Sequence, residues 1–202
     1  MTALFDIIKT EIEAQGPITV ARYMELALGH SEYGYYMKQD PFGEQGDFVT
    51  APEISQMFGE MIGLWACVVW QAMGSPDPLN LVEVGPGRGT LMADALRATQ
   101  MVEAFEDAAR VWLVETSPAL REIQKKTMTP TMMMPAWRDR FADVGDGPLI
   151  VLANEFFDAL PIRQSVRADD GWRARLVGLT DEGDGLESGV SEDTIAATFI
   201  PH

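Results

Sequence analysis

Apolar residues recur at helical spacing in the N-terminal part of the chain, and short apolar runs separated by helical patterns follow further along. Residues 2–14 place four apolar side chains on one face of a helix, which Gly16 and Pro17 end. Thr19 is a favourable cap for a second, short helix, and Gly29 is its natural stop. The chain is therefore expected to begin with two helices.

A third helix is expected to start at Thr50. The stretch Thr50-Ala-Pro-Glu53 has the residues of a capping box, with proline in the first turn. Glu53 therefore has two open roles, as capping partner or as ligand contact. Gly59 and Gly63 predict close packing of this helix on another element. Its apolar face is expected to comprise Ile54, Phe58, Met61, Ile62, Trp65 and Val69.

From Leu79 onward, strands are expected to alternate with helices, which predicts an α/β fold with a doubly wound, mostly parallel sheet. The expected strands are residues 79–84, 111–115, 131–134 and 148–154, and helices are expected at 91–98 and 118–124. Beyond them, residues 163–177 predict two strands around the turn Asp169-Asp170-Gly171. The acidic stretch 181–193 is typical of a solvated loop.

Composition and charge exclude several classes of function. The formal net charge of −16 disfavours nucleic acid as a partner, because a negative field repels its phosphates. Cys67 is the only cysteine, and His30 and His202 are the only histidines, which argues against a metal site and against a Ser-His-Asp triad. No secretory signal is evident, and the apolar stretch 61–70 is too short to span a bilayer. A cytoplasmic protein is expected.

The most informative stretch is a glycine-rich turn directly after the first expected strand. Gly85, Gly87 and Gly89 stand at first, third and fifth positions, whereas a dinucleotide fingerprint needs the third glycine at the sixth, where Thr90 stands. Glu83 would also face a pyrophosphate with like charge. The same carboxylate suits the ammonium of S-adenosylmethionine, which carries no phosphate. Glu115, at the end of the next strand, is placed to accept ribose hydroxyls.

Four blocks in order, GDFVTAPEISQMFGE, EVGPGRGTL, VETSPALREIQ and NEFFDALP, resemble the MidA-like family of class I S-adenosylmethionine-dependent methyltransferases. The resemblance implies an N-terminal helical segment with a cofactor-covering loop at residues 1–76, and a Rossmann-like core at residues 77–202. Because family members are longer, we expect the last strands of the sheet to be missing. The implied cofactor contacts are Glu83, Gly85, Gly87, Gly89, Glu115, Thr116, Gly46, Asp47, Thr50 and Glu53.

The family includes an enzyme that methylates arginine in a protein subunit of mitochondrial complex I, so the resemblance implies a protein substrate of that kind. Eukaryotic relatives are implied to work in the mitochondrial matrix. Glu155 and Asn154 follow the last strand of the alternation, where a carboxylate can polarise a guanidinium and an amide can position it, and Asp158 is a second candidate carboxylate.

Two alternatives remain open at the level of sequence. One is a non-catalytic domain that binds the cofactor or acts as an assembly partner, and the other is a nucleotide-dependent oxidoreductase on a similar sheet. An unfinished sheet edge would also favour association into a homo-oligomer.

Overall fold

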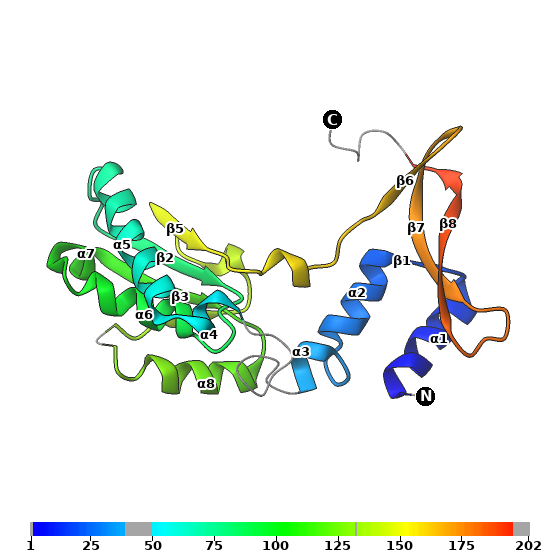
Figure 1. Ribbon diagram of the computed structural model, residues 1–202, viewed down its shortest axis with the longest axis horizontal. Coiled ribbons are helices and arrows are strands. Elements are labelled where there is room, and N and C mark those ends of the chain that lie inside the picture. Colours follow the sequence, from blue (N-terminus) through cyan, green and yellow to red (C-terminus); the bar gives the residue numbers. More distant parts are fainter. Residues whose placement is uncertain (1, 39–49, 132, 196–202) are drawn as a thin grey trace. The chain divides into compact units, whose positions relative to one another are not determined.

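The computed structural model describes residues 2–38, 50–131 and 133–195, in two compact units that are treated separately below (Figure 1). One unit spans Asp40–Asp158, and the other combines Met1–Gln39 with Ala159–His202. This division differs from the expected boundary between residues 76 and 77. The physical reason is that β1 (Ile18–Thr19) pairs antiparallel with β7 (Gly171–Leu179), which joins the N-terminal helices to the C-terminal strands.

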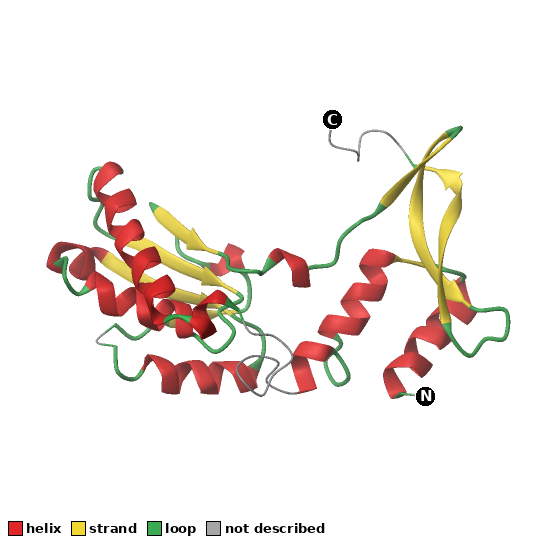
Figure 2. Cartoon of the chain, in the orientation of Figure 1, coloured by secondary structure: helices red, strands yellow, loops and turns green. Residues whose placement is uncertain are grey.

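The unit Asp40–Asp158 is built on a four-stranded parallel sheet, which confirms the predicted α/β class (Figure 2). Its strands are β2 (Leu79–Val84), β3 (Ala109–Val114), β4 (Ala136–Arg138) and β5 (Leu149–Leu152), in the order β4-β3-β2-β5. The expectation of a strand at 131–134 was wrong. The Thr131 hydroxyl donates to the carbonyl groups of Met128 and Met133, so this segment turns after a helix.

The strand order contains a reversal beside the first strand. From β2 the chain moves outward to β3 and then β4, and it returns to form β5 on the other side of β2. In open parallel sheets the carboxyl ends of the two strands at such a reversal border a crevice where ligands bind. A ligand site is therefore expected at the residues that follow β2 and β5.

Helices account for most of the rest of this unit. They are α4 (Ala51–Ile54), α5 (Gln56–Ala72), α6 (Thr90–Thr99), α7 (Glu103–Ala108) and α8 (Pro118–Met128), with 3₁₀ turns η1 (Phe141–Asp143) and η2 (Phe157–Ala159). The single helix expected after Thr50 is two, because Ser55 has an extended backbone conformation that separates α4 from α5. Thr50 precedes α4 but its side chain makes no capping hydrogen bond. The Ser117 hydroxyl caps α8 as expected, accepting from the Leu120 N–H at 3.3 Å.

Helix α5 packs on α6 through its small residues, as its glycines predicted. A Cβ atom on Gly63 would lie 2.3 Å from the Ala95 carbonyl oxygen, so only glycine allows this approach. The buried positions of α5 are Gly59, Gly63, Ala66, Cys67 and Trp70. The expected apolar face was therefore wrong in part: Ile54, which ends α4, is 72% exposed, and Met61 and Trp65 of α5 are 59% and 51% exposed.

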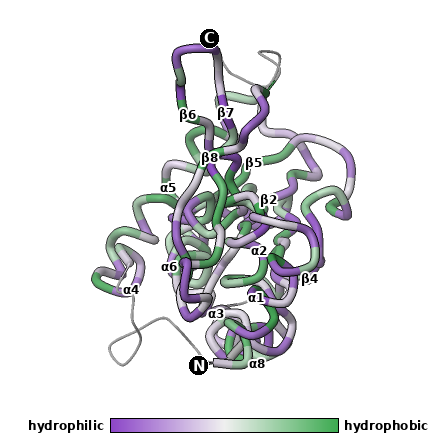
Figure 3. Tube along the Cα trace, turned by 90° about the vertical axis from the view of Figure 1, so that its right-hand side faces the viewer, coloured by the Kyte–Doolittle hydropathy of each residue, from purple (hydrophilic) through white to green (hydrophobic). Residues whose placement is uncertain are grey.

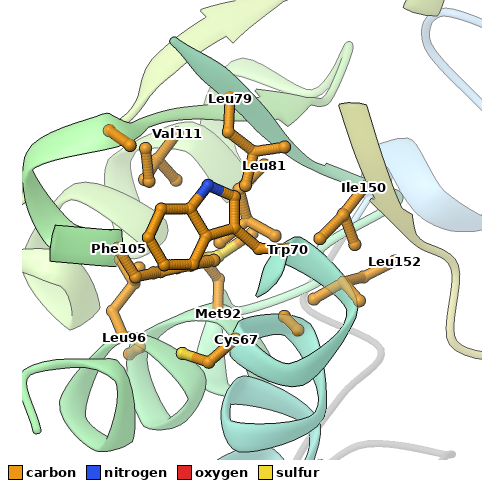
Figure 4. Close-up of a cluster of buried hydrophobic side chains, with 14 of the residues drawn as sticks. Cys67, Trp70, Leu79, Leu81, Met92, Leu96, Phe105, Val111, Ile150 and Leu152 are labelled. Atoms are coloured by element: carbon orange, nitrogen blue, oxygen red, sulfur yellow. The ribbon is translucent and has the colours of Figure 1, made fainter. Parts of the chain in front are cut away.

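The core of this unit fills the space between the sheet and its helices (Figure 4). Trp70 lies at its centre, with its ring edge-to-face on Phe105 at 5.5 Å and its indole N–H donating to the Pro76 carbonyl. Leu81 of β2 and Ile150 of β5 contribute from the sheet. Strand β5, whose residues are all apolar, is a hydrophobic segment in Figure 3.

The second unit is a four-stranded antiparallel sheet with helices. It contains α1 (Ala3–Gln15), α2 (Val20–Gly29), α3 (Tyr35–Lys38), β1, β6 (Ser165–Ala168), β7 and β8 (Leu186–Thr194). The predicted hairpin of β6 and β7 is present, and the Thr19 side chain caps α2. The solvated loop expected at 181–193 was wrong: the backbone of β8 pairs with β7 over residues 186–194, while its acidic side chains stay exposed.

Candidate functional site at the carboxyl edge of the parallel sheet

The glycine turn joins the end of β2 to the start of α6. The Gly85 N–H donates to the Val114 carbonyl oxygen at 3.1 Å, which ties the turn to the end of β3. Gly85 has φ +63° and Gly89, which precedes α6, has φ +82°, a backbone region that disfavours other residues. A Cβ atom on Gly85 would lie 2.4 Å from the ring of Phe156. The turn therefore lies against the segment that follows β5.

Glu83 is buried within β2, two residues before the turn. It pairs in register with Leu113 of β3 and Leu152 of β5, and only 2% of its surface is exposed. Burial raises the pKa of its carboxyl group to about 8, a shift that the backbone N–H of Met92 opposes. Within the described part of the chain no donor reaches its Oε2 atom.

The burial of Glu83 corrects the electrostatic argument drawn from the sequence. From the sequence, Glu83 was expected to be an ionised carboxylate that repels phosphate. With a pKa near 8 the carboxyl group is mostly protonated at pH 7, so repulsion alone does not select against a dinucleotide. The buried oxygen without a donor is a better indicator of a ligand, since buried polar atoms are rarely left unpaired.

Glu115 follows β3 and is held by hydrogen bonds at both oxygens. Oε1 accepts from the Ser117 N–H at 2.8 Å, and Oε2 accepts from the Gln124 side chain at 3.3 Å. Burial raises the pKa of this carboxyl group, and the N–H groups of Ser117 and Thr116, Gln124 and Arg121 partly offset the rise. Thr116 itself is exposed. Gly85 and Glu115 lie at the carboxyl ends of paired strands, so the structure places them side by side.

The segment around α4 reaches the same edge of the sheet. The Thr90 hydroxyl, at the first residue of α6, donates to the Glu53 carboxylate at 2.6 Å. The Glu53 carboxylate thus contacts the residue after the glycine turn, and its role as a ligand contact stays a prediction. Thr50 is half-buried just before α4, and the candidates Gly46 and Asp47 lie outside the described residues.

The acceptor-side candidates follow β5. Asn154 is half-buried, Glu155 is exposed with φ +49°, and Asp158 is exposed in η2. Phe156 packs on Gly85, whereas Phe157 is 67% exposed and is not part of the core. The contact of Phe156 with the turn brings this segment next to the predicted cofactor residues.

Two partners in this region were missed at the level of sequence, Gln124 and Trp137. The Gln124 side chain donates to the Gly87 carbonyl oxygen at 2.7 Å and accepts from the Trp137 indole N–H at 2.7 Å. A signal was available, since Leu120, Gln124 and Met128 are spaced four residues apart and form the buried stripe of α8. A glutamine in an apolar stripe indicates a buried polar contact.

The described residues contain no helix that is both long and apolar enough to cross a bilayer. They also contain no group of three or more His, Cys, Asp or Glu side chains arranged to hold a metal ion.

Comparisons with known proteins agree with this geometry. A protein arginine methyltransferase NDUFAF7 from Danio rerio, named as mitochondrial, is 41% identical over 87% of this chain and 47% of its own. The human protein of the same name is 39% identical over 95% of this chain and 49% of its own. The chain thus spans about half the length of the curated relatives it matches.

A solved structure is similar across both units. It is the crystal structure of a COG1565 superfamily member from Burkholderia thailandensis bound to S-adenosyl-homocysteine, with a TM-score of 0.80 and 28% identity. The match covers 96% of this chain and 51% of that one. The model of the family described as "Putative S-adenosyl-L-methionine-dependent methyltransferase" matches residues 61–201. The resemblance expected from the four sequence blocks is confirmed, and the chain belongs to this family of S-adenosylmethionine-dependent methyltransferases.

Proposed function

We propose that this chain binds S-adenosylmethionine at the carboxyl edge of its parallel sheet and takes part in methyl transfer to an arginine of a protein substrate. One observation carries the proposal: the carboxyl groups of Glu83 and Glu115 flank the glycine turn at the ends of two paired strands, beside the strand reversal. The Danio rerio and human relatives named as protein arginine methyltransferases support the choice of arginine.

The residues present fit this cofactor chemically. Glu83 has a buried oxygen without a donor, which an ammonium group would satisfy. Each oxygen of Glu115 accepts a hydrogen bond within the protein, and a carboxylate oxygen can accept further hydrogen bonds from ribose hydroxyls. Gly85 and Gly89 carry no side chains of their own, and their missing Cβ atoms make room for Phe156 and Gln124 to pack on the turn. Gly87 and Thr116 are proposed as further contacts, as are Thr50 and Glu53, together with Gly46 and Asp47.

S-adenosylmethionine, when bound, supplies an electrophilic methyl group, and the protein's task is to align the acceptor and exclude water. Glu53 and Thr90 hold α4 against the start of α6 and so fix one side of the turn. Phe156 covers Gly85 and presents an apolar ring at the same edge. Positioning of this kind can lower a barrier by about 7–11 kcal/mol.

On the acceptor side we propose Glu155 and Asn154 as the groups that orient a guanidinium, with Asp158 as a second carboxylate. An exposed carboxylate can hold the positive charge on the nitrogens that do not react, which leaves the attacking nitrogen richer in electrons. The net charge of −16 favours approach of a cationic segment. Within protein substrates, a respiratory complex I subunit is the one that the sequence resemblance implies.

The compartment and the state of assembly remain proposals. The curated relatives are named as mitochondrial, which supports a mitochondrial setting for eukaryotic members, whereas the cytoplasmic placement of this chain rests on sequence. A non-catalytic, cofactor-binding role is the alternative, and methyl transfer by the wild-type chain distinguishes the two. A homo-oligomer remains a prediction.

Calorimetry and methyl transfer together test the proposal. We expect S-adenosylhomocysteine to bind the wild-type chain and NAD not to bind, and Glu115→Ala to abolish the binding. Incubation with labelled S-adenosylmethionine and arginine-rich peptides should transfer label, and Glu155→Gln should lower transfer while leaving affinity for the cofactor unchanged. Binding without any transfer by the wild type would favour the non-catalytic role, and binding of NAD alone would overturn the cofactor assignment.

A further inference from the structure

We propose that Gln124 is a positioning residue that holds the glycine turn and Glu115 in the arrangement needed to bind the cofactor. The proposal rests on the proposed function, and it assigns to α8 a role that neither the glycine turn nor the family match specifies. Gln124 lies in the third of the four resemblance blocks and is not itself among the proposed cofactor contacts.

The Gln124 amide contacts both the glycine turn and Glu115. Its side chain is completely buried, with 0% of the residue exposed. The Nε2 group donates to the Gly87 carbonyl oxygen at 2.7 Å and to Oε2 of Glu115 at 3.3 Å. One amide group thus spans from the turn after β2 to the residue after β3.

Trp137 of β4 fixes which way the amide points. An indole N–H can only donate, so the 2.7 Å contact from Trp137 must be to the amide oxygen, and the two amide hydrogens then face Gly87 and Glu115. The indole ring is partly buried and packs against the hydrophobic core, which keeps it in place. Trp137, Gln124 and Glu115 thus form a connected set of hydrogen bonds.

Gln124 also packs directly on the turn. A Cβ atom on Gly89 would lie 3.4 Å from Cγ of Gln124, so the side chain is in van der Waals range of the residue that precedes α6. The carboxylate of Glu115 has a second anchor in the Ser117 N–H, which leaves Gln124 as the anchor of Oε2. Without this amide, Oε2 would lose the side-chain donor of Gln124, and the carboxylate would rely on backbone N–H groups such as that of Ser117.

Other side chains of similar size could not make the same hydrogen bonds to Gly87 and Glu115. Methionine has no N–H group, so it would leave the Gly87 carbonyl oxygen and Oε2 of Glu115 without this donor. Glutamate has the same shape but, when ionised, would place a negative charge near another carboxylate and a carbonyl oxygen. If Gln124 had only a structural role, its replacement would lower stability without changing cofactor affinity. Measuring both quantities therefore separates a structural role from a positioning role.

The test compares Gln124→Met with a control that also removes a buried hydrogen bond far from the site. Thr99→Val is that control, since the buried Thr99 hydroxyl donates to the Leu96 carbonyl within α6. We expect Gln124→Met to raise the Kd for S-adenosylhomocysteine by about tenfold or more, and Thr99→Val to lower Tm without changing Kd. Trp137→Phe, which leaves Gln124 in place, should show a smaller rise in Kd.

A double-mutant comparison asks whether Gln124 acts through Glu115. In a Glu115→Gln background, Gln124→Met should weaken binding by a smaller factor than in the wild type, because the carboxylate it positions is gone. Equal factors in both backgrounds, or a fall in Tm with unchanged Kd, would overturn the positioning role.

Hydrogen exchange in the absence of cofactor tests the positioning role of Gln124 separately from cofactor binding. In the ligand-free protein, Gln124→Met should speed hydrogen exchange at the Ser117 and Gly89 amides, which donate to Glu115 and to the Pro86 carbonyl. Thr99→Val should leave both amides protected. If the wild type does not bind S-adenosylhomocysteine, the proposed function fails, and unchanged exchange at both amides in Gln124→Met would overturn the positioning role independently.

Discussion

The Thr90 hydroxyl donates a 2.6 Å hydrogen bond to the carboxylate of Glu53, two residues that are far apart in the sequence. The bond joins α4, which follows the segment predicted to cover the cofactor, to the first residue after the glycine turn. It therefore couples the position of α4 to the glycine turn.

We expect Thr90→Val to weaken binding of S-adenosylhomocysteine by about three- to tenfold, because a hydrogen bond to a charged group stabilises by about 1.5–3 kcal/mol and part of that holds α4 in place. Thr90→Ser keeps the hydroxyl and should bind as the wild type does. Calorimetry at constant pH measures both, and a valine variant with wild-type affinity would show that the contact does not support the site.

Cofactor affinity should depend on pH through Glu83. Burial raises the pKa of this carboxyl group to about 8 in the protein without ligand, whereas an ammonium partner favours the ionised form. Affinity for S-adenosylhomocysteine should therefore fall as the pH is lowered from 8, approaching about tenfold per pH unit. Calorimetry in buffers of different ionisation enthalpy should detect release of a proton on binding. Glu83→Gln should bind more weakly at pH 8 and lose this dependence.

Stability should depend on pH through the same residue, with a defined sign. The pKa of Glu83 is higher in the folded chain than its ordinary value of 4.5, so folding retains a proton that the unfolded chain releases. Its contribution to the free energy of unfolding is full below pH 4.5 and declines as the pH rises towards 8, by at most about 1.4 kcal/mol per pH unit. Thermal melts of the wild type minus those of Glu83→Gln should show this decline, and parallel curves for the two proteins would contradict it.

Residue spacing predicted the parallel sheet and the place of the candidate residues at its carboxyl edge, because those features depend on local patterns. The glycines at 85, 87 and 89, the strand before them and the Ser117 cap each leave a signal within a few residues. The strand ends then meet because parallel strands share a carboxyl edge. Glu83 and Glu115 could be placed at that edge without knowing any side-chain contact.

Long-range contacts explain what the sequence could not predict. Glu53 could serve as a cap or as a ligand contact, and only the approach of α4 to α6 pairs it with Thr90. Met61 and Trp65 follow an apolar pattern that a core helix would show, yet the approach of Gly63 to Ala95 turns them outward. The sequence of β8 lacks the alternation of apolar and polar residues that predicts a strand, and it forms a strand because its backbone pairs with β7.

The contact between Gly85 and Phe156 gives a prediction on how the turn is packed. An alanine at Gly85 would adopt φ +63°, which costs roughly 1–2 kcal/mol, and its Cβ atom would overlap the Phe156 ring at 2.4 Å. We expect Gly85→Ala to lower the free energy of unfolding by about 2–4 kcal/mol, measured by denaturant unfolding. Gly145→Ala is the matched control: Gly145 is exposed, has no positive φ and meets only Trp112 at 4.0 Å, so its change should stay within about 0.5 kcal/mol.

A second substitution separates overlap from backbone strain at this position. Phe156→Ala removes the ring, so in that background Gly85→Ala should cost only the strain of the left-handed backbone, about 1–2 kcal/mol. The difference between the two costs measures how tightly the segment after β5 is held against the turn. If Gly85→Ala costs the same with and without the ring, the strand-end segments do not pack together in solution, and the placement of Asn154 and Glu155 beside the cofactor residues loses its physical basis.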